Sequence, residues 1–220
     1  VHGKLVLQDK NDESAEILLE RIREEKKRLV KEGKLKKDRH ESIIFRRDNS
    51  YYEKLDGAER CIDDEIPFEI PKTWAWSRIG MAFTLQAGKN ISASEIKENP
   101  YPNSFLCYGG NGIRGYVSQS NRSGEYPIIG RQGALCGNIN VATGEFYATE
   151  HAICVETYAS TYIAWACLFL EALNLNQYAT ATAQPGLSVS KINEVLIPIP
   201  PLKEQIRIHH KFKNCISFIQ

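Results

Sequence analysis

The sequence predicts an α+β protein in which a β-rich globular body is flanked by long amphipathic helix segments. Apolar residues recur at near-helical spacing at both ends of the 220-residue chain. Between these ends, short runs of β-branched and aromatic residues alternate with turns that contain Gly or Asn. Hydrophobic residues make up 42% of the chain, which is enough to build a core inside such a body.

Residues 1–33 are predicted to hold the end of an amphipathic helix. A cap signal, Asp-Glu-Ser-Ala at residues 12–15, precedes four apolar positions at near-helical spacing, and Gly33 ends the pattern. Those positions are Ile17, Leu18, Ile22 and Leu29. Glu and Lys surround them, so the apolar stripe is narrow.

Residues 34–65 are predicted to form a basic linker or loosely packed arm. The segment is polar and irregular, with turn signals at residues 48–50 and 56–57. Residues 26–47, which overlap it, carry ten Lys or Arg and three acidic residues, a net charge of +7. Such a run is compatible with a polyanionic partner and, equally, with a solvated helix end.

Residues 66–201 are predicted to form the β-rich body. Prolines at 67 and 71 exclude regular helix there, so residues 66–71 are expected to be an extended strap packed on the domain. Trp74 and Trp76 are assigned to core packing. Strands are expected at residues 74–85, 105–117, 126–130, 139–141, 146–149 and 152–156, followed by a buried helix at 162–175, a short helix at 190–194 and a strand at 195–199.

A second amphipathic helix is predicted to begin near Leu202 and to occupy residues 202–220. Its apolar stripe consists of Ile206, Phe212, Ile216 and Ile219. Each flanking helix therefore has apolar surface that it can bury against the other.

The stretch YGGNGIRGYV, residues 108–117, contains the Gly-x-Gly-x-x-Gly spacing of a dinucleotide-binding turn. That spacing binds a pyrophosphate only where a helix follows the turn. Alternating β-branched and aromatic residues follow here, so a β-hairpin with Asn111-Gly112 at its tip is the preferred interpretation.

The cysteine pattern and the absence of targeting signals favour a cytoplasmic protein. Six single cysteines without a Cys-x-x-Cys pair indicate free thiols in a reducing compartment. No run of 18 apolar residues and no signal peptide is present, so no membrane partner is expected. Met81 is the one methionine, and we therefore expect that residue 1 is not the natural start.

Catalytic motifs do not stand out. No phosphate-binding loop and no Gly-x-Ser-x-Gly turn occurs, and the histidines lack the partners of a metal site. Asp64, Glu95 and Lys97 formally match a nuclease arrangement, but no strand flanks the last two. We therefore predict a non-catalytic protein with no metal site and no cofactor of its own.

Several stretches together resemble the specificity subunit of type I restriction-modification enzymes. They are GKLVLQDKNDESAEILLERIREEKKRLVKEGKLKKD, EIPFEIPKTWAWSRIG, YGGNGIRGYV, IIGRQGALCGNI, FYATEHA and AQPGLSVSKINEVLIPIPPLKEQIRI. The last is the most specific, because Ile-Pro-Ile-Pro-Pro-Leu-x-Glu-Gln introducing a helix is typical of that family. The resemblance extends over nearly the whole chain.

The resemblance implies a DNA-binding protein that reads one half of a bipartite target. Such subunits carry two target-recognition domains separated by conserved helices, and this chain resembles one domain, at 66–201, with the end of one spacer helix and the start of the next. Expected partners are double-stranded DNA, modification subunits that bring S-adenosylmethionine, and a restriction subunit that brings ATP and Mg²⁺. A homodimer through the flanking helices is also expected. The alternative is an assembly module without intrinsic DNA specificity.

Turn residues with side chains suited to DNA are the candidate contacts. Arg and Gln suit guanine and adenine edges, Thr suits a base edge and Tyr a base or sugar, while Lys and Ser suit phosphates. For each residue singly, a surface ion pair or a turn role is the structural alternative. The candidates are Lys34, Lys36, Lys37, Lys89, Asn111, Arg114, Arg131, Gln132, Tyr147, Thr149, Gln184 and Ser188.

Overall fold

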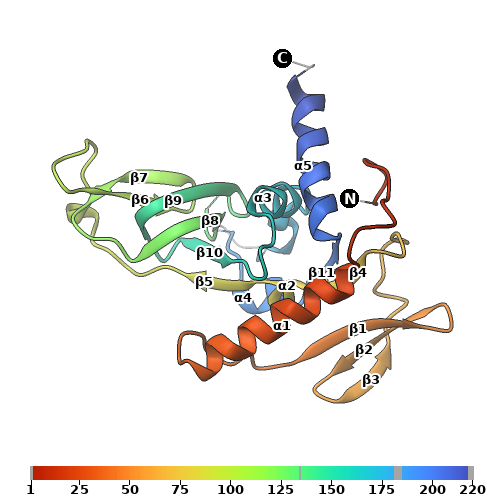
Figure 1. The fold of residues 1–220 in the computed structure, drawn as a ribbon. Helices are drawn as coiled ribbons and strands as arrows, with labels where there is room; N and C mark the ends of the chain where they lie inside the picture. Colours follow the sequence, from red (N-terminus) through yellow and green to blue (C-terminus); the bar gives the residue numbers. More distant parts are fainter. Residues whose placement is uncertain (1, 134, 181–184, 218–220) are drawn as a thin grey trace. The chain divides into compact units, whose positions relative to one another are not determined.

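The structure is a computed structural model that describes residues 2–133, 135–180 and 185–217. It divides into two compact units, whose helices and strands are labelled on the ribbon of Figure 1. Unit 1 comprises Val1–Phe83, Tyr158–Trp165 and Glu194–Gln220, and unit 2 comprises Thr84–Thr157 and Ala166–Asn193. The α+β fold class predicted from the sequence is confirmed. The predicted domain boundaries at residues 33, 65 and 201 stay predictions.

Unit 1 contains a three-stranded antiparallel sheet where an irregular arm was predicted. Its strands are β1 (Ser42–Arg47), β2 (Ser50–Leu55) and β3 (Ala58–Cys61), in the order β1-β2-β3. The turn signals were correct, because Asp48, Asn49, Asp56 and Gly57 all have positive φ, as two-residue type I′ hairpin turns require. The expectation of an irregular segment was wrong because charged and polar residues interrupt the apolar alternation of these strands.

Buried Glu53 explains why β2 was not predicted as a strand from the sequence. This carboxylate is 1% exposed and occupies an inward position that an apolar residue would normally take. It accepts hydrogen bonds from Arg78 Nη2 at 2.8 Å, from Arg60 Nη2 at 2.6 Å and from Ser42 Oγ at 2.5 Å. Burial raises the pKa of Glu53, but these hydrogen bonds outweigh it and hold the pKa at about 2.

Two helices of unit 1 match the sequence predictions in position. Helix α1 (Ala15–Lys31) buries Leu18 and Ile22, and ends just before Gly33, which has a φ of 70°. Helix α5 (Leu202–Ser217) begins where predicted. Three residues of its predicted stripe are not buried within the described residues: Ile206, Phe212 and Ile216 are 39%, 38% and 41% exposed. The fourth, Ile219, lies outside the described residues.

The core of unit 1 surrounds the two tryptophans. Trp74 and Trp76 are buried with Ile62 and Ile70, as the sequence predicted for the tryptophans. Strand β4 (Ala75–Arg78) pairs antiparallel with β11 (Leu196–Ile199). The single strand predicted at residues 74–85 is wrong, because the short helix α2 (Ile79–Ala82) separates β4 from β5 (Thr84–Ala87).

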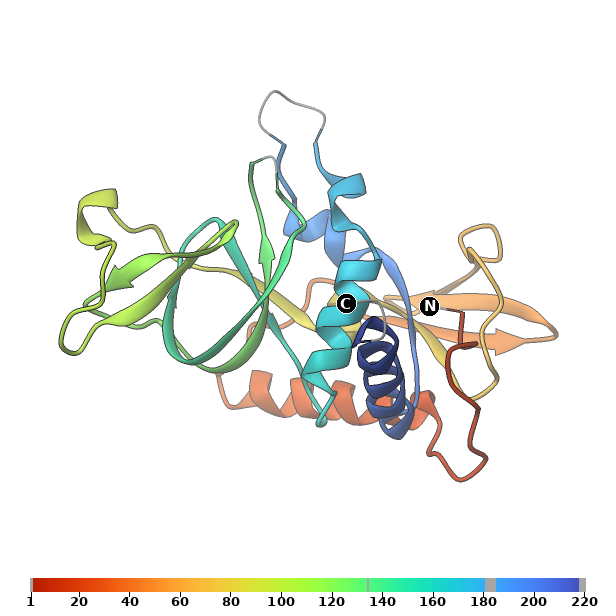
Figure 2. The same ribbon diagram turned by 90° about the horizontal axis from the view of Figure 1, so that it is seen from above.

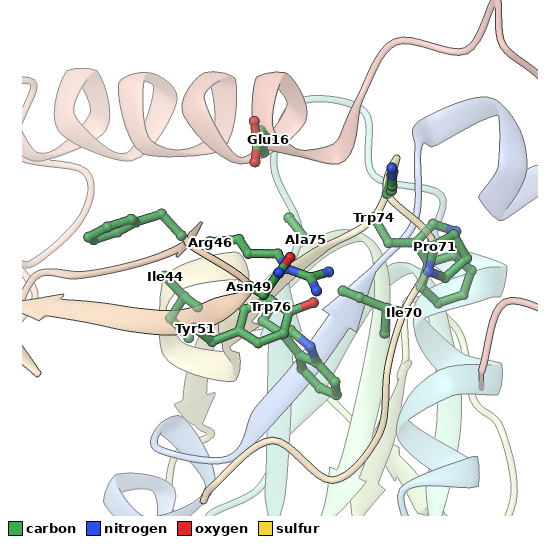
Figure 3. A pocket seen from close by; sticks show the side chains of 12 residues that line it. Glu16, Ile44, Arg46, Asn49, Tyr51, Ile70, Pro71, Trp74, Ala75 and Trp76 are labelled. Atoms are coloured by element: carbon green, nitrogen blue, oxygen red, sulfur yellow. The ribbon is translucent and has the colours of Figure 1, made fainter. Parts of the chain in front are cut away.

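A hollow of about 370 Å³ lies between the β1–β2 turn and residues 70–76 of unit 1. Figure 3 shows that the head groups of Arg46, Asn49 and Tyr51 gather there beside the ring of Trp76. The Arg46 guanidinium stands 5.3 Å from the Tyr51 ring centroid and 3.5 Å from the carboxylate of Glu69. The Arg46 guanidinium therefore has both of its contacts, the Tyr51 ring and the Glu69 carboxylate, within unit 1.

Unit 2 is built on a six-stranded sheet with the order β5-β10-β8-β9-β6-β7. Its further strands are β6 (Phe105–Gly109), β7 (Gly112–Val117), β8 (Arg122–Gly130), β9 (Ile139–Ala148) and β10 (Ala152–Glu156). All neighbours pair antiparallel except β6 and β9, which are parallel. The two strands predicted at 139–141 and 146–149 are one strand, β9, which pairs with β8 through the Gly124↔Gly144 position.

Side chains at the C-terminal end of β9 are buried on both faces of the sheet. Phe146 and Ala148 pack on one face with Ile128, while Tyr147 packs on the other with Val117. The helical elements of unit 2 are η1 (Ala93–Glu95), η2 (Leu175–Tyr178) and α4 (Val189–Asn193). Helix α3 (Ile163–Ala172), predicted at 162–175, contributes its first three residues to unit 1 and the rest to unit 2.

All six cysteines are free, in agreement with the sequence prediction. Among the helices of the described residues, none has the length and apolar character needed to cross a membrane.

Candidate nucleic-acid interface

Several turns of unit 2 that carry predicted contact residues converge on one another. The β8–β9 turn lies at their centre. Arg131 donates its backbone N–H to the carbonyl of His151 at 2.8 Å, and its own carbonyl accepts from Leu187 N at 2.8 Å. Gly133 N donates to Pro185 O at 3.0 Å. Figure 2 shows the β8–β9 turn and the segment leading into α4 side by side.

The β6–β7 hairpin joins the same cluster through a close glycine contact. A Cβ added at Gly130 would lie 2.0 Å from Gly110 O, so only glycine permits this approach of the two turns. The predicted hairpin is confirmed, but its tip is shifted by one residue. Gly109 pairs with Gly112, which leaves Gly110 and Asn111 as the two turn residues.

The end of β5 brings Lys89 to this cluster. Gly88 N donates to Ala152 O and Lys89 N donates to Ala148 O, both at 3.0 Å. A Cβ at Gly88 would stand 2.0 Å from the carbonyl oxygen of Ala148. The backbone of Lys89 therefore runs beside β9, and a bridge pairs it with Thr149.

Four of the predicted contact side chains are exposed in this cluster: Lys89, Asn111, Arg114 and Gln132. Asn138 Nδ2 stands 3.5 Å from Asn111 Oδ1. Within the part of the chain that the structure describes, no side-chain hydrogen bond or ion pair holds Lys89, Arg114 or Gln132. These three side chains are available to a ligand.

Arg131 has a different environment from its neighbour Gln132. Its side chain is half-buried, and its Nη1 donates to the carbonyl of Glu150 at 3.4 Å. Because its backbone N–H and carbonyl are also paired, Arg131 joins the β8–β9 turn to the β9–β10 turn. This geometry gives Arg131 a part in holding the turns together.

Tyr147 and Thr149, which were also predicted as contacts, are buried. Tyr147 is 5% exposed, and its hydroxyl donates to Asn90 O at 3.0 Å. Thr149 is fully buried, and its backbone N–H donates to Tyr108 O at 2.9 Å. Tyr147 lies on β9 and Thr149 follows its end, and the sequence pattern did not reveal that both side chains are buried.

Ser188 precedes α4 and its carbonyl accepts from Ile192 N at 3.0 Å. The short helix predicted at residues 190–194 therefore begins one residue earlier, at Val189, and Ser190 lies inside the first turn of α4. The hydroxyls of Ser188 and Ser190 are 2.7 Å apart, which gathers two hydroxyls at this helix start. Gln184 lies outside the described residues.

Asn138 and the Glu150–His151 pair belong to the cluster although they were not among the predicted contacts. His151 Nε2 is 3.0 Å from Glu150 Oε1. Glu150 Oε2 and His151 Nδ1 are buried and have no hydrogen-bond partner among the described residues. The sequence signal that points to Asn138 is its position beside Gly137 in the same turn.

The predicted basic contacts Lys34, Lys36 and Lys37 belong to unit 1 and follow α1. All three are exposed. Lys34 Nζ is 2.8 Å from a Glu32 carboxylate oxygen, which lowers the pKa of Glu32 chiefly through that hydrogen bond. Among the described residues, no group of three or more His, Cys, Asp or Glu is arranged to hold a metal ion.

These turns are joined by backbone hydrogen bonds and carry exposed Arg, Lys, Gln and Asn side chains, which are residue types that suit contacts with nucleic acid. Residues 71–220 match the family described as the type I restriction modification DNA specificity domain. The chain belongs to this family.

Two curated relatives are similar to parts of the chain. The type I restriction enzyme EcoprrI specificity subunit of Escherichia coli is 48% identical over 133 residues, which are 59% of this chain and 33% of that protein. The EcoEI specificity subunit of Escherichia coli is 40% identical over 104 residues, 47% of this chain and 14% of that protein. The matches thus span a third or less of these relatives' own length.

Solved structures share the fold. The S subunit of a type I restriction-modification system from M. genitalium has a TM-score of 0.56 at 17% identity, covering 64% of this chain and 38% of that chain. The HsdS subunit from Thermoanaerobacter tengcongensis has a TM-score of 0.55 at 19% identity, covering 70% and 40%. The family resemblance read from the sequence is confirmed.

Proposed function

We propose that unit 2 reads the bases of one half of a bipartite double-stranded DNA target for a type I restriction-modification enzyme. The observation that supports this most is the convergence of the β6–β7, β8–β9 and β9–β10 turns, with exposed polar side chains, in a chain of the DNA specificity family. The chain itself catalyses no reaction in this proposal.

The side chains divide between base contacts, phosphate contacts and support. Asn111 is exposed in the two-residue β6–β7 turn, and Gln132 is exposed just after β8, where a bridge pairs it with Gly186. Amide side chains suit the adenine edge in the major groove. Lys89 and Ser188 suit phosphate oxygens, and Arg114 suits either a phosphate or a guanine edge. Arg131 acts mainly as a positioning residue, because its guanidinium and backbone join two turns.

The partners of the chain follow from the same proposal. Modification subunits would bind the flanking helices and bring S-adenosylmethionine, and a restriction subunit would bring ATP and Mg²⁺. The exposed apolar residues Ile206, Phe212 and Ile216 of α5 support a homodimer that joins two reading units. No cofactor of this chain is proposed.

Selection from a random duplex pool tests the reading role and separates it from the assembly alternative. An enriched motif with salt-sensitive binding is the expected result. Binding to partner subunits without any enriched motif would instead favour an assembly module.

The Arg131→Ala and Arg131→Lys variants test the assignment of that residue. A positioning role predicts that Arg131→Ala weakens discrimination at several base positions together, because both joined turns loosen. Loss of preference at a single position would make Arg131 a base reader instead. Arg131→Lys is the matched control, since it keeps the charge but loses the planar guanidinium fork.

A further inference from the structure

A groove of about 580 Å³ runs beside the C-terminal half of α1 in unit 1, and the DNA-reading role of unit 2 does not use it. We name it the α1 groove. Its floor is apolar and includes Leu19, Val30, Ile43 and Met81. These four side chains are each only half-buried, so the floor retains apolar surface that a ligand can cover.

The rim of the α1 groove is basic, and some of its charges already have partners. Lys26 Nζ is 2.8 Å from an Asp38 carboxylate oxygen and 2.7 Å from Gly80 O. Lys27 stands 3.4 Å from Glu41. These contacts hold the segment after α1 in place along the groove.

Three further cations of the rim have no such partner. Lys31, Lys37 and Arg39 line the groove, are exposed, and form no ion pair with any described residue. They lie within residues 26–47, which carry a net charge of +7. The groove therefore presents an uncompensated positive rim around an apolar floor.

The basic rim and the apolar floor together define which chemical groups a ligand of the α1 groove must carry. Acidic groups complement the rim, and a large apolar side chain is needed to cover the floor. A DNA phosphate satisfies the rim alone, because its oxygens gain nothing from aliphatic carbon. A protein segment with acidic residues around an apolar anchor satisfies both, in the manner of a peptide laid into a hydrophobic groove.

We propose that the α1 groove docks an acidic segment of a partner protein, which inserts an apolar side chain against Leu19, Val30 and Met81. The contact is independent of DNA reading by unit 2. It gives the basic run after α1 a protein partner in place of the phosphate backbone.

The single methionine provides a direct reporter for this groove. Met81 is the one methionine of the chain, and its Sδ already accepts from Ser42 N at 3.4 Å on the groove side. Labelling the full chain with ¹³C-methyl methionine gives one chain-derived NMR signal, assigned by its loss in Met81→Leu. The probes are synthetic peptides with four acidic residues around one Leu, Ile, Phe or Trp, and the same peptide with Ser at that position.

At least one apolar-anchored peptide is expected to shift the Met81 signal saturably, and the Ser peptide is not. The double variant Lys37→Glu, Arg39→Glu should bind that peptide about tenfold more weakly, equivalent to about 1.4 kcal/mol. Lys34→Glu with Lys36→Glu is the matched control, since it changes the charge equally at residues that do not line the groove. It should weaken binding by less than about threefold.

The proposal is overturned if no peptide moves the Met81 signal, if the Ser peptide binds as well, or if both charge-reversed variants weaken binding equally. It is also overturned if a DNA duplex displaces the peptide from the groove in a salt-sensitive way. Thermal unfolding checks that each variant folds. Should the Lys37, Arg39 pair fail this check, Val30→Asn on the groove floor replaces it, with the same expected loss of peptide binding.

Discussion

The close contact between Gly130 and Gly110 predicts a specific consequence of adding one methyl group. In Gly130→Ala the new Cβ would lie 2.0 Å from the backbone oxygen of Gly110 and 3.2 Å from that of Leu135. An ordinary contact needs at least 3.4 Å, so the β6–β7 turn must retreat by about 1.4 Å. Overpacking of this kind costs about 1–3 kcal/mol of folding stability.

The same displacement should weaken the recognition of specific DNA, because the turn that moves carries Asn111. A base contact contributes about 1–3 kcal/mol to discrimination, so losing it should reduce the ratio of specific to nonspecific affinity by about 5- to 150-fold. The assay combines denaturant unfolding with two affinities, for the selected motif and for a mutated one. Both are measured at one salt concentration, since DNA affinity depends on salt.

Gly57→Ala is the matched control for this prediction. Gly57 has a φ of 93°, so alanine is strained there, but nothing lies within 4 Å of the added Cβ and the position belongs to unit 1. It should cost about 1–2 kcal/mol of stability without changing the affinity ratio. An unchanged ratio in Gly130→Ala, or an equal loss in Gly57→Ala, would refute the idea that the glycine contact positions a base-reading turn.

Three further predictions use other parts of the chain. Gln132→Ala should relax preference at one base position by about 1–3 kcal/mol, measured by selection from a random duplex pool, and uniform weakening would argue for a phosphate contact. If Lys34, Lys36 and Lys37 contact phosphates, their combined change to Ala should lower the salt slope by about one per contact while leaving the specificity ratio unchanged. The α1-groove proposal instead predicts no change of slope from Lys37. Glu53→Gln should destabilise unit 1 at neutral pH, because the depressed folded pKa of about 2 contributes stability above the unfolded value of about 4.5 that is lost as pH falls towards 2. The unfolding free energies of the two proteins, compared between pH 6 and pH 2.5, should therefore converge, and a constant difference would contradict this account.

Local signals in the sequence identified elements whose pattern depends on near neighbours. The hairpin at 105–117 and strand β10 were predicted closely, because period-2 alternation bounded by turn residues is a local property. The starts of α1 and α5 were predictable for the same reason, since capping residues and proline act within a few positions. Strands β1–β3 were missed because Glu53 takes an inward position that hydrogen bonds from Ser42, Arg60 and the distant Arg78 make tolerable.

The candidate site shows the same division between local and distant information. Residue type nominated Lys89, Asn111, Arg114 and Gln132, and these side chains are exposed. Sequence alone did not distinguish the buried Tyr147 from these exposed candidates. Where a strand is covered on both faces, packing against other elements decides which of its side chains are buried.

The sequence by itself determined the fold class, the family and the residue types able to contact DNA, since composition, periodicity and motifs are properties of the chain in one dimension. The tertiary structure alone decided which turns meet. Gly130 and Gly110 are twenty positions apart, and His151 lies a further 21 beyond Gly130. Their approach depends on the pairing of β8 with β9 and β10, a non-local arrangement that no sequence window contains.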